Sequence, residues 1–563
     1  MNLTGQASSV FDAVRRAGLL DPLSVAALTS ATAVWGPSIA AAYGAAAVRY
    51  PNRIAVVDDH GRLTYTELDR RSARLAAALR KAGLARGDAI GILCRNHRGF
   101  VEANLAVAKL GAKPVLLNTG LPAGQLAEVI NREAAHLVIA DHDLVDTLDC
   151  DETAGDLLVV TCDPAANEEW SFPGFSSRRP LLQLPRPFDV VNPVILTSGT
   201  TGAPKGTRRS TDPKATVGLL GFVEAIPYQR GDVMVLPAPL FHAWGFSQLT
   251  LAATLAGTVV LRDRFDPETV INDIEVHGAT VLAAVPVMLH RILASERRLD
   301  RLNTGDTDRD LTALRVVATS GSALPGDLAT RWMDRFGDSL YNLYGSTEVG
   351  QVSVAGPTDL RADPDTAGMP LRGITVRILD DHDNEVAAGV TGQIMIESAA
   401  RFDGYTDGGG KRMVGALMSS GDRGRLDADG RLFVDGRTDD MIISGGENVF
   451  PGNIERSLMA HAAVGDAAVV GVADDDLGQR IRAVVVPAVA MSDQPAASLT
   501  RTLRAHLKQD LAAHEVPREY VYVTELPRNT TGKVLRTKLA GPKRSVPNRA
   551  AAPTAAARRS GAA

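Results

Sequence analysis

The chain has 563 residues, which is too long for a single hydrophobic core and predicts at least two domains. Hydrophobic residues make up 45% and charged residues 22% of it, as in an ordinary globular protein. A formal net charge of −5 argues against the basic field of a general nucleic-acid binder, so we expect no nucleic-acid partner. Composition leaves the oligomeric state open.

Three cysteines, Cys94, Cys150 and Cys162, show neither the spacing of a metal site nor that of a disulfide framework. This pattern is typical of proteins from a reducing compartment. The first residues also lack the basic stretch and apolar core of a secretory signal. We therefore expect a cytoplasmic protein.

The stretch from Pro22 to Val48 carries no charge and invites interpretation as a membrane span. It consists largely of Ala, Ser, Thr and Gly, with Gly36 and Pro37 in its middle, whereas a span needs about 20 strongly apolar residues. We expect no transmembrane helix there, and peripheral contact with a membrane stays open as an alternative.

From about residue 64, helical and strand patterns alternate. Thr64 and Glu67 form a capping-box signature at the start of an amphipathic helix, and the apolar run Ala89–Cys94 follows as a buried strand. Similar runs recur through residues 136–141, 279–285 and 313–321. This rhythm predicts an α/β fold in which mixed, largely parallel sheets are flanked by helices.

Near residue 370 the pattern changes. Runs such as GITVRILD and GRLFVDGR alternate apolar and polar residues between Asp/Gly turns, which predicts an antiparallel, β-rich subdomain. After Arg437 a smaller α+β unit begins. We predict a large N-terminal domain over residues 1–438, a small C-terminal domain over 439–540, and a disordered basic tail over 541–563.

The ten residues Thr197 to Gly206, TSGTTGAPKG, follow a short apolar strand and are the most informative motif. Glycines let backbone N–H groups approach an anion, the hydroxyls add neutral donors, and Lys205 adds a charge suited to phosphate. Because Gly206 rather than Ser or Thr follows Lys205, this is not a P-loop. We interpret it as a polyphosphate cradle rather than a linker.

Four further segments follow in order: YGSTE from Tyr344, Ser-Gly-Asp ending at Asp422, GRTDDMIISGGENVFP, and PRNTTGKVLR with Lys533. Tyr344 offers an aromatic face for a base, Thr347 a hydroxyl for a phosphate, and Glu348 a carboxylate for Mg²⁺. Asp422 is expected just after a tight turn, where it would accept hydrogen bonds from both hydroxyls of a ribose.

Together these segments resemble those of the adenylate-forming superfamily of acyl- and aryl-CoA synthetases, luciferases and peptide-synthetase adenylation domains, over about residues 40 to 540. GRTDDMIISGGENVFP is most similar to bacterial fatty-acyl-CoA ligases. The resemblance implies that ATP and Mg²⁺ activate a carboxylic acid, expected to be a fatty acid, to an acyl-adenylate with release of pyrophosphate. Coenzyme A would then take the acyl group and release AMP, after the small domain rotates about a hinge at Asp439.

The same resemblance implies a role for each matching residue. Thr347 would contact the α-phosphate, Glu348 would bind Mg²⁺, and Lys533 would bridge the acid and the α-phosphate. The β- and γ-phosphates would be held by Thr197, Ser198, Gly199, Thr200, Thr201, Gly202 and Lys205. The remaining nucleotide contacts would come from Gly321, Ser322, Ala323, Asn342, Tyr344 and Gly345 around the adenine and from Asp422 and Arg437 at the ribose. Ser444, Gly445 and Gly446 would line the CoA channel, and His242, Trp244 and Phe246 the acyl pocket.

Alternatives stay open at this point. The enzyme could instead load a carrier protein, or act on an aryl or other carboxylic acid. CoA is favoured as acceptor because there is no conspicuous insertion before the hinge and no appended Gly-Gly-x-Ser carrier segment. A non-catalytic nucleotide binder is disfavoured, since Glu348, Asp422, Arg437 and Lys533 are all present. For His242, a packed structural role is as plausible as a pocket role.

Overall fold

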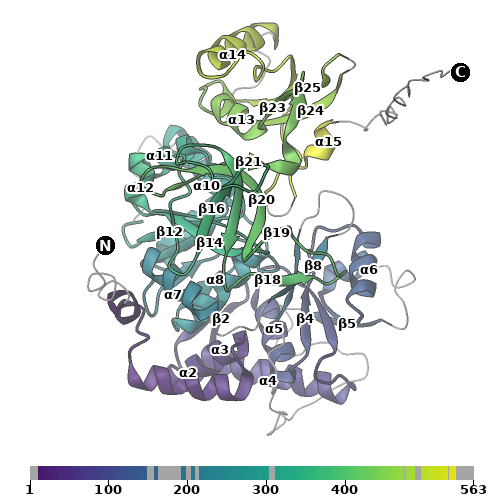
Figure 1. The fold of residues 1–563 in the computed structure, drawn as a ribbon. Coiled ribbons are helices and arrows are strands. Elements are labelled where there is room, and N and C mark those ends of the chain that lie inside the picture. The colour runs from purple at the N-terminus through teal and green to yellow at the C-terminus, as the bar shows by residue number, and fades with distance from the viewer. Residues whose placement is uncertain are drawn as a thin grey trace, which may run out of the picture. The chain divides into compact units, whose positions relative to one another are not determined.

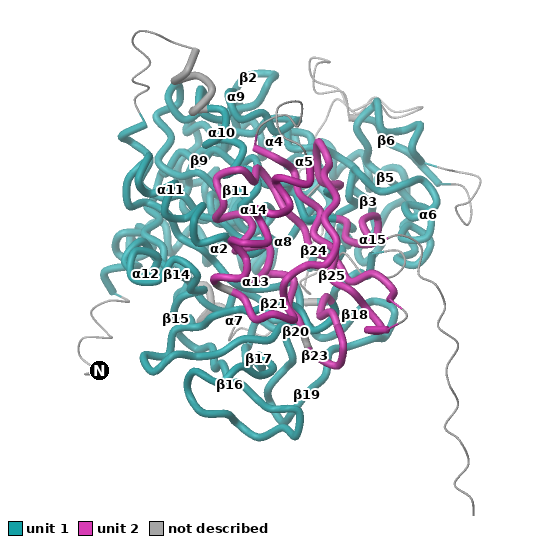
Figure 2. The backbone as a smooth tube through the Cα atoms, turned by 90° about the horizontal axis from the view of Figure 1, so that it is seen from above, with its two compact units in different colours: residues 1–439, 528–534 teal, residues 440–527, 535–563 magenta. Residues whose placement is uncertain are grey.

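The computed structural model describes residues 11–148, 157–162, 192–197, 204–209, 215–302, 311–474, 476–488, 496–529 and 532–540. They fall into two compact units, shown in Figure 2: residues 1–439 with 528–534, and residues 440–527 with 535–563. The mobile C-terminal domain stays a prediction. The predicted tail at 541–563 lies outside the described residues.

The uncharged N-terminal stretch forms two short helices, α2 (Pro22–Trp35) and α3 (Ile39–Arg49). Asp21 caps α2 by accepting from the Leu23 amide, and Gly36, with φ at 65°, ends it. Ser38 caps α3 in turn. Across the described ranges, the structure contains no helix with the length and apolar character needed to cross a bilayer.

The largest sheet of the first unit has nine described strands in the order β15-β14-β13-β12-β11-β9-β10-β1-β2. Its central strands pair in parallel, and β2, β14 and β15 pair antiparallel at the two ends. All four residues of β11 are buried, as expected for a parallel strand covered on both faces. The strands are β1 (Ile54–Asp58), β2 (Gly61–Thr64), β9 (Val233–Val235), β10 (Thr258–Val260), β11 (Val281–Ala284), β12 (Val316–Thr319), β13 (Leu340–Ser346), β14 (Gly350–Ala355) and β15 (Met369–Pro370).

A second sheet has seven described strands in the order β18-β8-β7-β4-β3-β5-β6. In Figure 1, its strands β4, β5 and β8 lie with α5 and α6. Buried Asn96 connects the second sheet to the first. Its Nδ2 donates to the carbonyls of Leu236 and Ala238, and its Oδ1 accepts from the Leu240 amide. The strands are β3 (Ala89–Leu93), β4 (Lys113–Leu116), β5 (Ala135–Asp141), β6 (Leu158–Cys162), β7 (Val194–Thr197), β8 (Lys205–Arg209) and β18 (Phe402–Tyr405).

Helices flank both sheets, which confirms the predicted α/β architecture. The predicted capping box is also confirmed: Glu67 Oε2 accepts from the Thr64 amide at 2.8 Å, and Thr64 Oγ1 accepts from the Glu67 amide at 3.2 Å. The helices are α4 (Tyr65–Lys81), α5 (Arg98–Leu110), α6 (Ala123–Arg132), η1 (His142–Thr147), α7 (Ala215–Ala225), α8 (Ala243–Thr254), α9 (Pro267–Val276), α10 (Pro286–Leu302), α11 (Gly326–Phe336) and α12 (Pro357–Ala362).

The predicted antiparallel region is confirmed as a third sheet of β16 (Thr375–Leu379), β17 (Gly392–Glu397), β19 (Met413–Val414), β20 (Leu417–Leu426) and β21 (Leu432–Arg437). One expectation is wrong. Asp422 does not follow a tight turn but lies inside β20, because its backbone is paired with Arg437 of β21. The glycine that suggested a turn is Gly421. Its φ is 86°, a value typical of turns, although it lies within the strand.

The second unit has its own sheet and its own core. β24 (Val464–Asp474) and β25 (Gly478–Pro487) form a long antiparallel pair, and helices α13 (Pro451–Met459) and α14 (Ala496–Asp510) contribute Ile454 and Leu503 to a buried cluster with Val485. This is the α+β organisation that the sequence predicts. The other elements are η2 (Thr438–Asp440), β22 (Ile442–Ser444), β23 (Glu447–Val449), β26 (Glu519–Tyr522) and α15 (Arg536–Ala540).

Candidate active site

The two ends of the predicted phosphate cradle are anchored by neighbouring strands. Thr197 ends β7 and Lys205 begins β8, and the two residues are paired in the sheet, with Thr197 Oγ1 donating to the Lys205 carbonyl at 3.2 Å. Lys205 Nζ lies 2.9 Å from Asp407 Oδ2. The predicted phosphate ligands between these ends, Ser198, Gly199, Thr200, Thr201 and Gly202, lie outside the described residues.

Glu348 and Thr347 lie on the turn between β13 and β14, and both are half-buried. Ser346 shapes this turn, because its Oγ accepts from the amides of Glu348 and Val349 at 3.2 and 3.4 Å. Glu348 Oε1 accepts a hydrogen bond of 2.8 Å from the hydroxyl of Tyr405. The sequence did not indicate Tyr405, because its contact with Glu348 depends on the pairing of β18 with β8.

Glu348 fits the predicted role as a magnesium ligand. Among the residues that the structure describes, no group of three or more His, Cys, Asp or Glu side chains could hold a metal by itself. Mg²⁺ prefers oxygen ligands, and proteins commonly bind it through one or two carboxylates together with substrate phosphates. A single half-buried carboxylate on the turn that also carries Thr347 is consistent with this mode.

The predicted ribose ligands come together in the third sheet beside β13. The Tyr344 hydroxyl donates to Asp422 Oδ2 at 2.6 Å, and Ser420 Oγ accepts from the Asp422 amide at 3.0 Å. Arg437 Nη1 lies 4.0 Å from Asp422 Oδ1, and Arg437 Nη2 donates to Asp439 Oδ2 at 3.0 Å. Burial raises the pKa of Asp422, against the opposing effects of the Tyr344 hydroxyl and the Arg437 charge.

The predicted adenine residues flank the ends of β12 and β13. Gly321, Ser322 and Ala323 are exposed just after β12, and the preceding Ser320 donates from Oγ to the Leu343 carbonyl at 2.9 Å. Asn342 is buried in β13 opposite Thr319. At Gly345 only glycine fits, because a Cβ there would lie 2.3 Å from the Gly350 carbonyl oxygen.

The three predicted acyl-pocket residues surround the start of α8. His242 precedes its first turn, and burial lowers the pKa of its imidazole to about 4, so the ring is neutral near pH 7. Trp244 is 8% exposed, and its indole N–H donates to the Ala284 carbonyl at 3.0 Å. Phe246 packs half-buried against the main core. These contacts fix Trp244 in place, while the pocket roles of the three residues stay predictions.

The predicted hinge and CoA residues divide between the units. Asp439 is the exposed residue at which the first long segment ends. In the second unit, Ser444 ends β22, and Gly445 and Gly446 form the following turn with φ of 62° and 89°, where a side chain would be strained. The segment 528–534 groups with the first unit and carries Lys533, whose amide donates to Asn529 Oδ1 at 2.8 Å.

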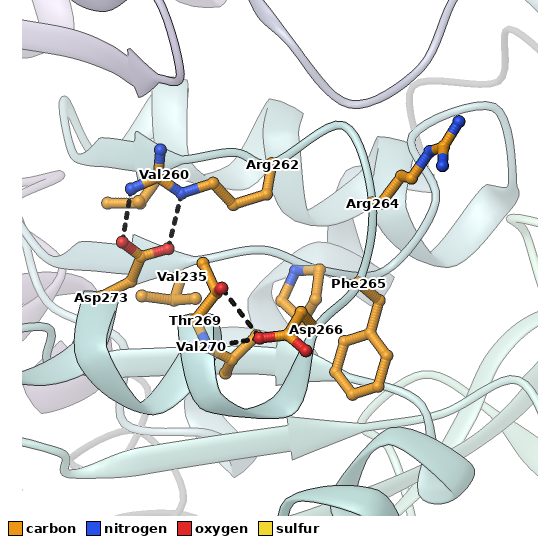
Figure 3. A pocket seen from close by; sticks show the side chains of 10 residues that line it. Val235, Val260, Arg262, Arg264, Phe265, Asp266, Thr269, Val270 and Asp273 are labelled. Atoms are coloured by element: carbon orange, nitrogen blue, oxygen red, sulfur yellow. Dashed lines mark hydrogen bonds and ion pairs between the residues drawn. The ribbon is translucent and has the colours of Figure 1, made fainter.

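Figure 3 shows a small pocket beside α9, lined by residues that include Val235, Val260 and Phe265. Arg262 crosses it to pair with Asp273 through two hydrogen bonds, and Asp266 caps α9 by accepting from the amide and hydroxyl of Thr269. These polar groups stabilise the helix and its attachment. None of the residues that line this pocket is among those predicted to bind ATP, the acid or CoA.

Known proteins resemble this chain along most of its length. The model of the AMP-binding enzyme family matches residues 43–406, and that of the AMP-binding enzyme C-terminal domain matches residues 453–533. A feruloyl-CoA synthase of Amycolatopsis sp is 32% identical over 496 residues, which cover 86% of this chain and 95% of the relative. The fatty acid–[acyl-carrier-protein] ligase ScoC of Streptomyces coeruleorubidus is 30% identical over 507 residues, 87% of this chain and 93% of the relative.

A solved structure leads to the same family. The o-succinylbenzoate CoA synthetase of Bacillus subtilis, in complex with its acyl-adenylate intermediate, has a TM-score of 0.74 and 26% identity, and the match covers 89% of this chain and 98% of the other. This confirms the predicted fold and, with the family models, the predicted use of ATP. The chain belongs to the family of AMP-binding enzymes, the adenylate-forming superfamily that its five motifs resemble.

Proposed function

We propose that the protein is an AMP-forming acid–thiol ligase that activates an aromatic carboxylic acid with ATP and transfers it to coenzyme A. The observation that carries the proposal is the grouping, in one compact unit, of a group for each part of ATP. In this proposal, Lys205 binds the polyphosphate and Glu348 binds the metal. Asp422 and Tyr344 bind the nucleoside. Two hydrogen-bonded networks hold these side chains in place.

The named relatives support the aromatic alternative better than our main expectation of a fatty acid. The feruloyl-CoA synthase and the o-succinylbenzoate CoA synthetase are both named for acids that contain a benzene ring. ScoC is named for a fatty acid and a carrier protein, so this second function needs its own test. Trp244, fixed against β11, favours a flat ring over a flexible chain in the proposed pocket.

Charge explains how the proposed residues promote adenylation. The acid and the triphosphate are both anions, so the approach of the carboxylate to the α-phosphorus is repulsive until positive charge offsets it. Lys533 would supply this charge where the new bond forms, and one such group in a water-poor site is worth about 10²–10³ in rate. Mg²⁺ at Glu348 would neutralise phosphate charge. Asp422 would orient the nucleotide through its ribose hydroxyls.

The second half-reaction needs a thiol where Lys533 acted in the first. A rotation of residues 439–540 about Asp439 would exchange Lys533 for the turn at Ser444, Gly445 and Gly446 beside the pantetheine arm. Motions of this kind commonly limit turnover in enzymes that close over their substrates.

A panel of acids tests the proposal directly. Purified protein is incubated with ATP, Mg²⁺ and an equimolar mixture of hydroxycinnamic, benzoic and C6–C16 fatty acids, with either CoA or a carrier protein bearing phosphopantetheine. Mass spectrometry of the thioesters should show an aromatic acyl-CoA as the main product. A fatty-acyl product, or acyl transfer to the carrier protein alone, would contradict the proposal.

Lys533→Ala provides the mechanistic control. It should abolish most acid-dependent pyrophosphate release but spare thioester formation from preformed acyl-adenylate, because Lys533 is proposed to act in the first step only. Equal loss of both half-reactions would rule out this role.

A further inference from the structure

Strand β18 lies where two predicted parts of the ATP site meet. At one end, the Phe402 amide donates to the Glu348 carbonyl at 2.7 Å. At the other, Tyr405 is paired with Thr207 of β8, and the Thr406 amide donates to the Gly206 carbonyl at 2.9 Å. A four-residue strand is thus bonded both to the turn that carries Glu348 and to the strand that begins at Lys205.

The side chain of Tyr405 adds a direct link. Its hydroxyl donates to Glu348 Oε1 at 2.8 Å, its ring packs edge-on against Phe402 with centroids 4.9 Å apart, and Lys205 Nζ lies 5.3 Å from the ring centroid. Three neighbours therefore fix the ring.

We propose that Tyr405 is a positioning residue that orients the Glu348 carboxylate for Mg²⁺. The inference rests on the proposed function, in which Glu348 is the metal ligand. With Oε1 held by the Tyr405 hydroxyl, the carboxylate cannot rotate freely, and Oε2 is presented in one direction. Hydrogen-bond partners of metal ligands act in this way, and their loss typically costs about 10–100-fold in metal affinity or activity.

Tyr405→Phe isolates the hydroxyl because it keeps the ring and its contacts with Phe402 and Lys205. Calorimetric titration with α,β-methylene-ATP, which cannot be adenylated, separates binding from catalysis. We expect the affinity for Mg²⁺ in the presence of this analogue to fall about tenfold or more. The affinity for the analogue without Mg²⁺ should change little. If Tyr405 were only structural, its loss would weaken binding of the analogue both with and without Mg²⁺.

Tyr228→Phe is the matched control. Tyr228 is fully buried in the first unit, and its hydroxyl donates to Gln248 Oε1 at 2.9 Å, so the variant also loses a tyrosine hydrogen bond. It should leave the Mg²⁺ affinity unchanged. Thermal unfolding of both variants shows whether they are folded alike.

The double variant Tyr405→Phe/Glu348→Gln shows whether Tyr405 acts through Glu348. If it does, removal of the hydroxyl has no further effect on Mg²⁺ affinity once the carboxylate is gone. An unchanged Mg²⁺ affinity in Tyr405→Phe, equal weakening with and without Mg²⁺, or a full additional effect in the Glu348→Gln background would each overturn the inference. Continued synthesis of aromatic acyl-CoA by the wild type would then leave the proposed function standing.

Discussion

The proposed ribose and phosphate ends of the ATP site both contain an acidic side chain close to a basic one, but they differ in exposure. At the ribose end, the side chain of Asp422 is 14% exposed and is already hydrogen-bonded to Tyr344. At the phosphate end, Lys205 and Asp407 are 44% and 34% exposed and pair with each other. In the proposed roles, Asp422 would be in place before ATP arrives, whereas the Lys205–Asp407 pair would have to separate to receive it. The site would therefore be preorganised where it binds the uncharged ribose hydroxyls. At the charged phosphate end, Lys205 would exchange Asp407 for the polyphosphate.

The largest effect should come from Asp422→Asn. The variant loses the charged acceptor for two ribose hydroxyls, and hydrogen bonds to charged groups are each worth about 1.5–3 kcal/mol. We expect kcat/KM for ATP, measured by pyrophosphate exchange, to fall about a hundredfold or more. Asp435→Asn is the control, because Asp435 pairs with Arg425 in the same sheet.

The stability of Asp422→Asn tests whether the carboxylate is kept for function. Burial raises the pKa of Asp422, so the folded protein binds this proton more tightly than the unfolded chain does. The free energy of unfolding then falls as the pH rises through the window between the ordinary and the raised pKa, and the cost is complete above it. The variant should therefore melt no lower than the wild type at pH 7. A lower melting temperature at pH 7 would mean that Asp422 supports the fold.

Asp407→Asn should have a smaller and opposite effect. Neutralising Asp407 frees Lys205 for the polyphosphate, and exposed ion pairs are weak, so the KM for ATP should fall by about twofold to fivefold. The gain should shrink at high salt, because salt screens exposed charges. Asp429→Asn, in an exposed pair with Arg431, is the control. Weaker binding of ATP would show that Asp407 orders the cradle instead of competing with it.

The smallest effect is expected at His242, which is half-buried like Asp422 but uncharged. With a pKa of about 4, it does not titrate in the folded protein between pH 5.5 and 8, so His242→Gln should leave the shape of the pH–rate profile in that range unchanged. The unfolded chain binds the proton near pH 6.5, so His242 reduces stability as the pH falls from about 6.5 towards about 4. The variant should lose less melting temperature between pH 7 and pH 5. A shifted rate profile would mean that His242 is charged in the enzyme.

Local signals in the sequence predicted much of this molecule. The capping box at Thr64 and the antiparallel strands after residue 370 follow from neighbouring residues, because hydrogen bonds and side-chain alternation act over short distances. Tyr344, Asp422 and Arg437 could be grouped in advance through the family resemblance, and the structure brings them together.

The contacts of Tyr405 and Asp407 could not be predicted in the same way. They depend on β18 pairing with β8, a strand far away in the sequence, and nothing in RFDGYTDGGG indicates this partner. Asp422 shows the opposite difficulty, since Ser-Gly-Asp has the composition of a turn although the ladder with β21 keeps it in a strand. At Asp422 the pairing of two consecutive strands overrode the local turn signal, whereas at Tyr405 there was no local signal to override.

The hydrogen bond between the Trp244 indole and the Ala284 carbonyl has a consequence for how the enzyme could be re-engineered. A side chain held in this way cannot swing aside for a larger guest, so the proposed acid pocket is bounded by a surface of fixed shape. A rigid surface of this kind excludes acids of the wrong shape even where it forms no hydrogen bond with them. Widening the range of acids would thus begin with a smaller residue at position 244, at the expense of the buried packing that the indole now provides.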